Sequence, residues 1–140
     1  MKTYSGSCHC GSVRYQAEVD LAEGTNRCNC SVCSKSRAWF AFAKGAERFR
    51  LVAGADSLFE YRWTPPGMAE PFLTYCFCGK CGIRVFAKGG PLEALGGTFH
   101  AVQVMTLDDA DPNDLAAAPV NYVDGLHGRF DRAPADTRLM

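Results

Sequence analysis

The eight cysteines constrain the fold most, because each lies two or three residues from another cysteine. Three groups are visible: C-H-C-G starting at Cys8, C-N-C-S-V-C starting at Cys28, and C-F-C-G-K-C-G starting at Cys76. Closely spaced thiols are soft ligands that suit a metal ion. Four disulfides in a secreted scaffold are the alternative, but the two thiols of a C-x-C pair are poorly placed to bond to each other. The spacing therefore favours metal sites.

Composition narrows the class of protein. The 140 residues suit one domain with a modest core of its own, and 47% hydrophobic content with a formal net charge of zero indicates a globular chain. The sequence lacks a basic stripe of the kind that predicts nucleic-acid binding. No apolar run in it approaches the ~20 residues of a membrane span. Residues 1–8 lack the apolar run of a signal peptide. We therefore expect a cytoplasmic protein whose thiols stay reduced.

Short alternating segments between glycine and proline turns predict a mainly β fold. Strands are expected at residues 13–18, 39–44, 49–52, 58–63, from 72 into the third cysteine group, at 83–88 and at 98–107. Residues 21–26 are expected to be a loop, and residues 108–119 a loop with at most one helical turn. The domain is expected to span residues 4–130, and the tail at 131–140 to fray.

Two of the cysteine groups predict one closed metal site. Cys78-G-K-Cys81-G is the usual C-x-x-C-G half of a zinc site, and Cys8 with Cys10 supplies a tighter half. Together they predict a structural zinc that joins the two ends of the core. Such a site can contribute on the order of 10 kcal/mol to folding.

The remaining group, Cys28, Cys30 and Cys33, offers three ligands in one turn. Three protein ligands with a free fourth position are typical of a catalytic zinc. Three thiolates make the ion a weak Lewis acid, but one soft enough to bind a thiol as thiolate. Cys76 leaves two alternatives open. It could be a fourth ligand that closes this second site, or a free buried thiol.

The ordered motifs resemble those of the glutathione-dependent formaldehyde-activating enzyme (GFA) family. The likeness rests on Gly6-x-Cys8-His9-Cys10-Gly11-x-Val13-x-Tyr15, Cys28-x-Cys30-Ser31-x-Cys33 and Phe77-Cys78-x-x-Cys81-Gly82. The segment from Phe49 to Tyr61 and Leu107-Asp108-Asp109 resemble the same family, so the likeness covers about residues 4–125.

This resemblance implies a β-tent fold, built from short antiparallel sheets around zinc knuckles. It also implies a structural zinc on Cys8, Cys10, Cys78 and Cys81, and a second, more labile zinc on Cys28, Cys30 and Cys33. The activity of the family is to join glutathione to formaldehyde, formally a carbon–sulfur lyase reaction in reverse. Two positions depart from the pattern: Asn29 stands where the family often has histidine, and Cys76 is an additional thiol.

Substrate contacts are expected close to the second cysteine group. Lys35 and Arg37 follow Cys33 and could pair with the carboxylates of glutathione, or they could belong to an ordinary solvated loop. His127 lies on a glycine-flanked turn that could reach a cleft, whereas His9 and His100 are expected to have no ligand role. Tyr122 and Asp124 line the site only if the end of the chain folds over it.

Two functions from different classes follow. The favoured one is a zinc-dependent carbon–sulfur lyase acting on an adduct of an aldehyde with glutathione or another small thiol. The sequence nominates no general acid or base for it. The alternative is a non-catalytic, zinc-stabilised module that binds a protein partner. A thiol-based metal or redox sensor, suggested by the surplus Cys76, is a weaker third hypothesis.

Overall fold

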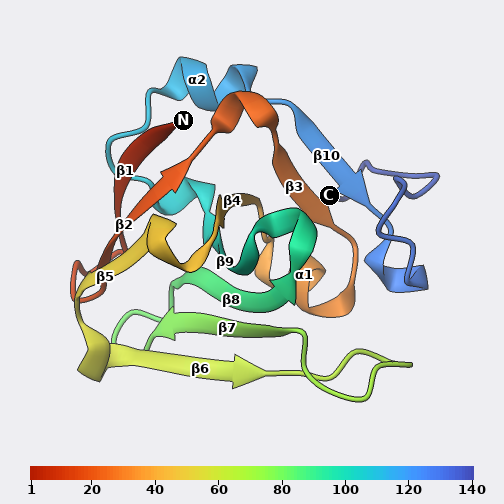
Figure 1. Ribbon diagram of the computed structural model, residues 1–140, viewed down its shortest axis with the longest axis horizontal. Helices are drawn as coiled ribbons and strands as arrows, with labels where there is room; N and C mark the ends of the chain where they lie inside the picture. The colour runs from red at the N-terminus through yellow and green to blue at the C-terminus, as the bar shows by residue number, and fades with distance from the viewer.

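A seven-stranded β-sheet organises the protein (Figure 1). The computed structural model describes all of residues 1–140. The strand order in this sheet is β10-β3-β4-β9-β8-β7-β6. Neighbouring strands run antiparallel, except that β10 and β3 are parallel. The strands are β3 (Thr25–Cys28), β4 (Phe40–Lys44), β6 (Leu58–Arg62), β7 (Leu73–Cys78), β8 (Arg84–Leu92), β9 (Gly97–Gln103) and β10 (Val120–Val123).

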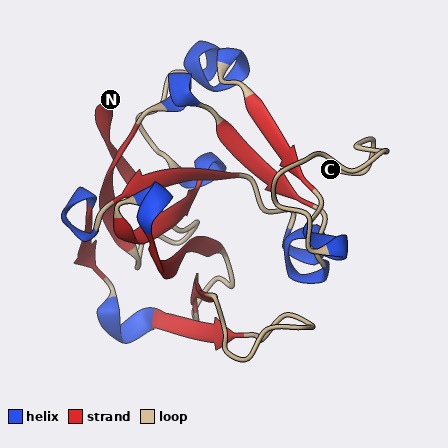
Figure 2. Ribbon diagram, turned by 45° about the vertical axis from the view of Figure 1, so that its right-hand side comes forward, coloured by secondary structure: helices blue, strands red, loops and turns tan.

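A smaller antiparallel sheet covers part of the larger one. Its order is β1-β2-β5, with β1 at Lys2–Ser7, β2 at Arg14–Val19 and β5 at Phe49–Ala53. Only two α-helices occur, α1 (Ser31–Ser36) and α2 (Pro112–Ala117), together with single turns of 3-10 helix. Figure 2 shows the strands in red and the short helical turns between them in blue.

The central strands are buried on both faces, because successive side chains of a strand point to opposite sides of the sheet. One face packs against the smaller sheet and supplies Cys76, Phe86 and Val102 to a cluster of 17 buried residues. The other face supplies the neighbours of these residues to a second cluster, which also contains Cys30 and Cys33. Those neighbours are Tyr75, Ala87 and Ala101.

The prediction of a mainly β fold is confirmed, and each of the seven expected strands has a counterpart in the structure. The prediction of a loop over residues 21–26 is wrong. A 3-10 turn at Leu21–Glu23 leads into β3 there, and the side chain of Thr25 is fully buried. Strands β1 and β10 and helix α1 were not expected. β10 and α1 are short, and Tyr4 is the one large apolar residue of β1, so their periodicity is too weak to recognise in the sequence.

The last ten residues contain no strand or helix. They nevertheless contact the rest of the chain, because Arg37 Nη1 donates a hydrogen bond to the carbonyl oxygen of Leu139 at 2.6 Å. The domain bounds 4–130 and the fraying of residues 131–140 stay predictions. Neither α1 nor α2 has the length and apolar character that crossing a membrane would demand.

Gly54 offers a test of how closely β5 packs on the first cysteine turn. Its φ is 90°, and a Cβ there would overlap the carbonyl oxygen of Ser12. Gly67 has φ 83° but open space around it. We expect Gly54→Ala to lower the free energy of unfolding by about 2–4 kcal/mol, against about 1 kcal/mol for Gly67→Ala. Denaturant titration of both variants measures this difference, and equal losses would contradict the packing described.

Candidate metal centres and the adjoining cleft

The first cysteine cluster joins the two ends of the core. Cys8 and Cys10 lie in the turn after β1, Cys78 ends β7, and Cys81 lies in the turn before β8. Their four sulfurs lie within 4.8 Å of one another. The Sγ atoms of Cys8 and Cys10 are 3.6 Å apart, and those of Cys10 and Cys78 are 3.7 Å apart. Thiolates on a tetrahedral zinc lie about 3.8 Å apart, so this donor set fits such an ion.

Two equivalent turns build this cluster. In the first, the backbone N–H of Cys8 donates to the oxygen of Val13, and that of Gly11 to the oxygen of Cys8. In the second, the N–H of Cys78 donates to the oxygen of Ile83, and that of Gly82 to the oxygen of Cys78. Gly11 and Gly82 have φ 76° and 75°, which glycine adopts without strain. A cysteine turn followed by a strand thus occurs at both places.

Backbone amides and hydroxyls prepare the first cluster to bind a cation. The amide of Val13 donates to Cys8 Sγ at 3.3 Å, and the amide of Lys80 donates to Cys78 Sγ at 3.4 Å. Hydrogen bonding from Ser12 lowers the pKa of Cys10 to about 6. Hydrogen bonds from the backbone at Cys10 and Ile83 lower the pKa of Cys81. Since the thiolate is the metal-binding form, these contacts suit metal binding.

The second cluster is built at the start of α1. Cys28 ends β3, and Cys30 is the N-cap residue of α1. Cys33 follows Cys30 by three residues, so both side chains lie on one face of the helix. The three sulfurs lie within 4.8 Å of one another, with Cys30 and Cys33 buried and Cys28 half-buried. The carbonyl oxygen of Cys30 accepts the N–H of Ser34 at 2.8 Å, which fixes this turn.

Cys30 is the preferred thiolate of this cluster. Hydrogen bonds from the side chains of Cys28 and Cys33, together with backbone amides at Cys33 and Val32, lower the pKa of Cys30 to about 3. The same side-chain interactions raise the pKa of Cys33 and Cys28. The three sulfurs could together serve as soft ligands for one cation.

The segment after β10 covers the second cluster. A Cβ on Gly125 would overlap Cys28 Sγ, so the backbone there packs directly on the sulfur. Asn29 fixes this segment, because its Nδ2 donates to Asp124 Oδ1 at 2.8 Å and its Oδ1 accepts the N–H of Leu126 at 2.9 Å. Both Oδ atoms of Asp124 lie 2.9 Å from His127 Nδ1.

Asp124 is buried, whereas the side chain of His127 is 60% exposed. The hydrogen bond from Asn29, followed by that from His127, lowers the pKa of Asp124. The carboxylate is therefore charged at neutral pH and orients the imidazole through Nδ1. Sequence reasoning had no means of identifying this pair as a unit. The glycine-flanked turn around His127 was the one available signal.

Cys76 does not join either cluster. Its side chain is fully buried in the cluster between the two sheets, and its Sγ lies 3.8 Å from the carbonyl oxygen of Thr74. Burial raises its pKa to about 11, so it stays a neutral thiol. Tyr75, the preceding residue, points to the opposite face and belongs to the cluster with Cys30 and Cys33. Of the two alternatives for Cys76, the structure agrees with the free buried thiol.

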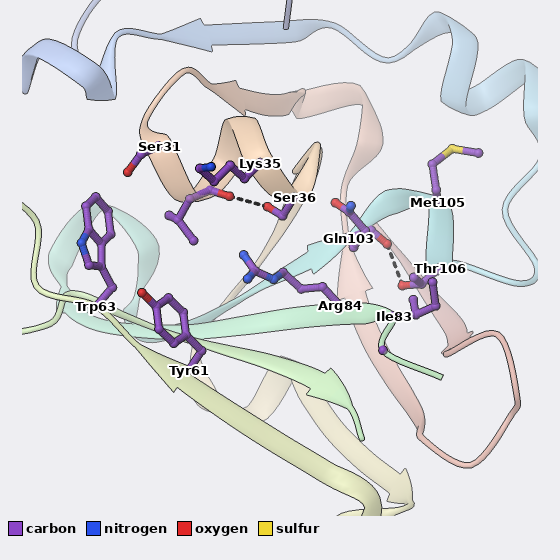
Figure 3. A pocket seen from close by; sticks show the side chains of 12 residues that line it. Ser31, Lys35, Ser36, Tyr61, Trp63, Ile83, Arg84, Gln103, Met105 and Thr106 are labelled. Carbon is purple, nitrogen blue, oxygen red and sulfur yellow. Dashed lines mark hydrogen bonds between the residues drawn. The ribbon is translucent and has the colours of Figure 1, made fainter. Parts of the chain in front are cut away.

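Lys35 and Arg37 lie on different sides of α1. Lys35 lines a cleft of about 790 Å³ between α1, the end of β6, the start of β8 and the end of β9 (Figure 3). Arg37 lies instead beside Cys28 and Cys33, in a small recess that Leu139 and Met140 also line. One of its guanidinium nitrogens is already used by the carbonyl of Leu139. The structure therefore does not bring these two cations together around one ligand.

The other two histidines lie away from the second cluster. His9 is exposed in the first cysteine turn, and His100 stacks on Phe49 with ring centres 4.0 Å apart. Burial lowers the pKa of His100 to about 4, which keeps it neutral.

Comparison with known proteins decides the family. The model of the glutathione-dependent formaldehyde-activating enzyme family matches residues 3–123. The chain belongs to this family. A Halomonas elongata protein named "Putative glutathione-dependent formaldehyde-activating enzyme" is 33% identical over 84 residues, which are 58% of this chain and 53% of that protein. The chain thus matches about half the length of this curated relative.

A solved structure has the same fold as this GFA-family chain. The crystal structure of a Rhodobacter sphaeroides protein superimposes with a TM-score of 0.64 at 28% sequence identity, covering 84% of this chain and 99% of that one. The family match ends at residue 123. The turn that carries Asp124 and His127 therefore lies just beyond the part of this GFA-family chain that the family model describes.

The metal content of cysteine variants tests the two clusters. We expect two ions per chain in the wild type and in Cys76→Ser, but one ion in Cys78→Ser and one in Cys30→Ser. Cys78→Ser should also lower the melting temperature most, because its cluster joins distant parts of the chain. Elemental analysis and thermal unfolding measure both effects. Loss of an ion in Cys76→Ser would contradict the placement of that thiol.

Proposed function

We propose that this protein is a zinc-dependent enzyme of the carbon–sulfur lyase type, acting on an adduct of an aldehyde with glutathione or another small thiol. The observation that carries the proposal is the second cluster, which gathers three sulfurs without a fourth. The first cluster, with four sulfurs, would hold a structural zinc. The family match supports a glutathione and formaldehyde chemistry at the second.

Cys28, Cys30 and Cys33 would hold the second zinc, and the donor set fits because its three sulfurs lie within 4.8 Å of one another. When bound there, a zinc ion with three thiolate ligands supplies a soft fourth position that favours a substrate sulfur in its thiolate form. In the reaction, a sulfur–carbon bond forms while the carbonyl π bond of the aldehyde breaks. The proton lost from sulfur ends on the carbonyl oxygen, and the reverse step releases thiol and aldehyde. We place this reaction in the cytoplasm, where thiols stay reduced.

The reaction needs a group that accepts the proton from sulfur and donates it to the carbonyl oxygen, and we assign this role to His127. It lies two residues beyond Gly125, whose backbone packs on Cys28 Sγ. Asp124 holds its Nδ1, which leaves Nε2 free to exchange a proton with the reacting groups. A buried carboxylate behind a histidine is a common arrangement for acid–base catalysis, because it fixes the tautomer and the direction of the ring.

Cys30→Ser tests the enzyme against the binding module. The variant should retain the β-rich circular dichroism spectrum and lose thiol-dependent consumption of formaldehyde, because the second ligand set is incomplete. Cys76→Ser is the matched control, being a cysteine outside both clusters, and should keep its turnover. Unchanged turnover in Cys30→Ser would refute the enzyme proposal. Absence of turnover in wild-type protein loaded with two zinc ions would favour the binding module instead.

A second test addresses His127. We expect His127→Ala to reduce kcat about a hundredfold or more without changing KM for the thiol, because the side chain is assigned to proton transfer and not to binding. Added imidazole should restore part of the lost kcat. Leu126→Ala, an exposed neighbour on the same turn, is the control and should behave as wild type. An equal loss in both variants would mean that the turn, not the imidazole, matters.

A further inference from the structure

The cleft beside α1 contains cations without anions. Its lining includes Lys35 and Arg84 but no aspartate or glutamate. No carboxylate forms a salt bridge with either side chain anywhere in the structure. Other arginines of the chain do form salt bridges; Arg62, for example, pairs with Glu60 at 3.5 Å. Two unpaired cations facing one concave surface favour an anionic ligand.

Arg84 is held in place before any ligand arrives. Its guanidinium carbon lies 4.7 Å from the centre of the Tyr75 ring, in a cation–π arrangement. One of its terminal nitrogens, Nη1, is buried and has no hydrogen-bond partner. A buried donor left without a partner is costly, on the order of 1–3 kcal/mol. The side chain of Arg84 lines the cleft, and a carboxylate fits a planar guanidinium with two parallel hydrogen bonds.

The rest of the cleft suits the body of a small organic ligand. Tyr61 and Trp63 form an aromatic side opposite α1, while Ser31 and Gln103 offer polar groups at other points of the lining (Figure 3). The figure shows the side chains of Arg84 and Lys35 both reaching into the space between α1 and these aromatic rings. A volume of about 790 Å³ is within the range of ordinary small-molecule sites.

The cleft lies next to the second cysteine cluster. Tyr75, which carries the guanidinium of Arg84 on its ring, belongs to the same buried cluster as Cys30 and Cys33. Val32 and Trp63 line the cleft and also pack against that cluster. Val32 and Trp63 thus connect the lining of the cleft to the buried cluster that contains Cys30 and Cys33.

We propose that Arg84, assisted by Lys35, forms a carboxylate-binding site that anchors the acidic end of a small thiol whose sulfur is directed to the second cluster. This assignment rests on the proposed function for the identity of the reacting group, but the binding itself requires no chemistry. It replaces Arg37, which is bound to the tail, by Arg84 as the principal anchor. It also predicts that carboxylate-bearing thiols are preferred to neutral ones.

Binding of S-methylglutathione to zinc-loaded protein tests the site, because this probe carries the carboxylates of glutathione but cannot react through sulfur. Isothermal titration calorimetry should give a Kd that rises about tenfold or more in Arg84→Gln, the effect expected for loss of a charge-assisted hydrogen bond. Arg84→Lys should bind with intermediate affinity, since it keeps the charge without the paired geometry. Arg62→Gln, an exposed arginine beside the cleft, is the matched control and should bind as wild type.

The diester of S-methylglutathione supplies the second arm. It should bind wild-type protein more weakly than the free acid, and bind wild type and Arg84→Gln equally. Equal affinity of wild type for acid and diester, no binding of the acid to wild type, or the same loss in Arg62→Gln as in Arg84→Gln would each overturn the proposal. If binding depends on Arg84 while formaldehyde turnover is absent, the carboxylate site stands and the proposed reaction fails. If formaldehyde turnover occurs but ligand binding does not depend on Arg84, the proposed reaction stands and the carboxylate site fails.

Discussion

The convergence of four thiols at the first cluster is the constraint on which the rest of the structure depends. It fastens the turn after β1 to the end of β7, across about seventy residues of sequence, at the place where the two sheets meet. Cys8 and Cys78 also belong to the buried cluster between those sheets, so the metal ligands and the apolar core are one continuous unit. A cation bound there would stabilise the contact between the sheets as well as the local turns.

The alternation of side chains along the strands then separates the residues packed against the smaller sheet from those that lie near the candidate site. Along β7, Tyr75 faces the second cysteine cluster while Cys76 faces the smaller sheet. The same alternation applies to Phe86 and Ala87 in β8. One face of the large sheet is thus assigned to stability, and the other carries α1, the three-sulfur cluster and the cleft. A one-residue change of register in β7 would exchange the two faces, so the bulge after Cys76 and the pairing with β8 matter for the site.

Much of this arrangement could be predicted from the sequence, because metal-ligand spacing and strand alternation are local properties. The seven strands and the grouping of Cys8 with Cys78 follow from them. The position of Cys76 could not be predicted in this way. Alternation shows that it points to one face of β7, but which cluster lies on that face is known only from the packed structure. Arg84 was missed for a related reason: in the sequence it is an ordinary polar residue of an alternating strand. Its isolation from any carboxylate exists only in three dimensions, after α1, β6 and β9 have come together around it.

Asn29, a departure from the family pattern, makes specific contacts with another part of the chain. The resemblance expects a histidine between the first two thiols of the central group, and this chain has an amide there. That amide uses both of its ends, donating to Asp124 and accepting from Leu126, and so attaches the turn that carries His127. An imidazole at position 29 can donate and accept as well, but its two nitrogens are fixed on a rigid ring, whereas the amide forks from a single carbon. The turn that Asn29 attaches lies just beyond the residues that the family model matches, and its His127 is oriented by a buried carboxylate. Asn29 and His127 both contact the carboxylate of Asp124, so a change at either residue alters the setting of the other.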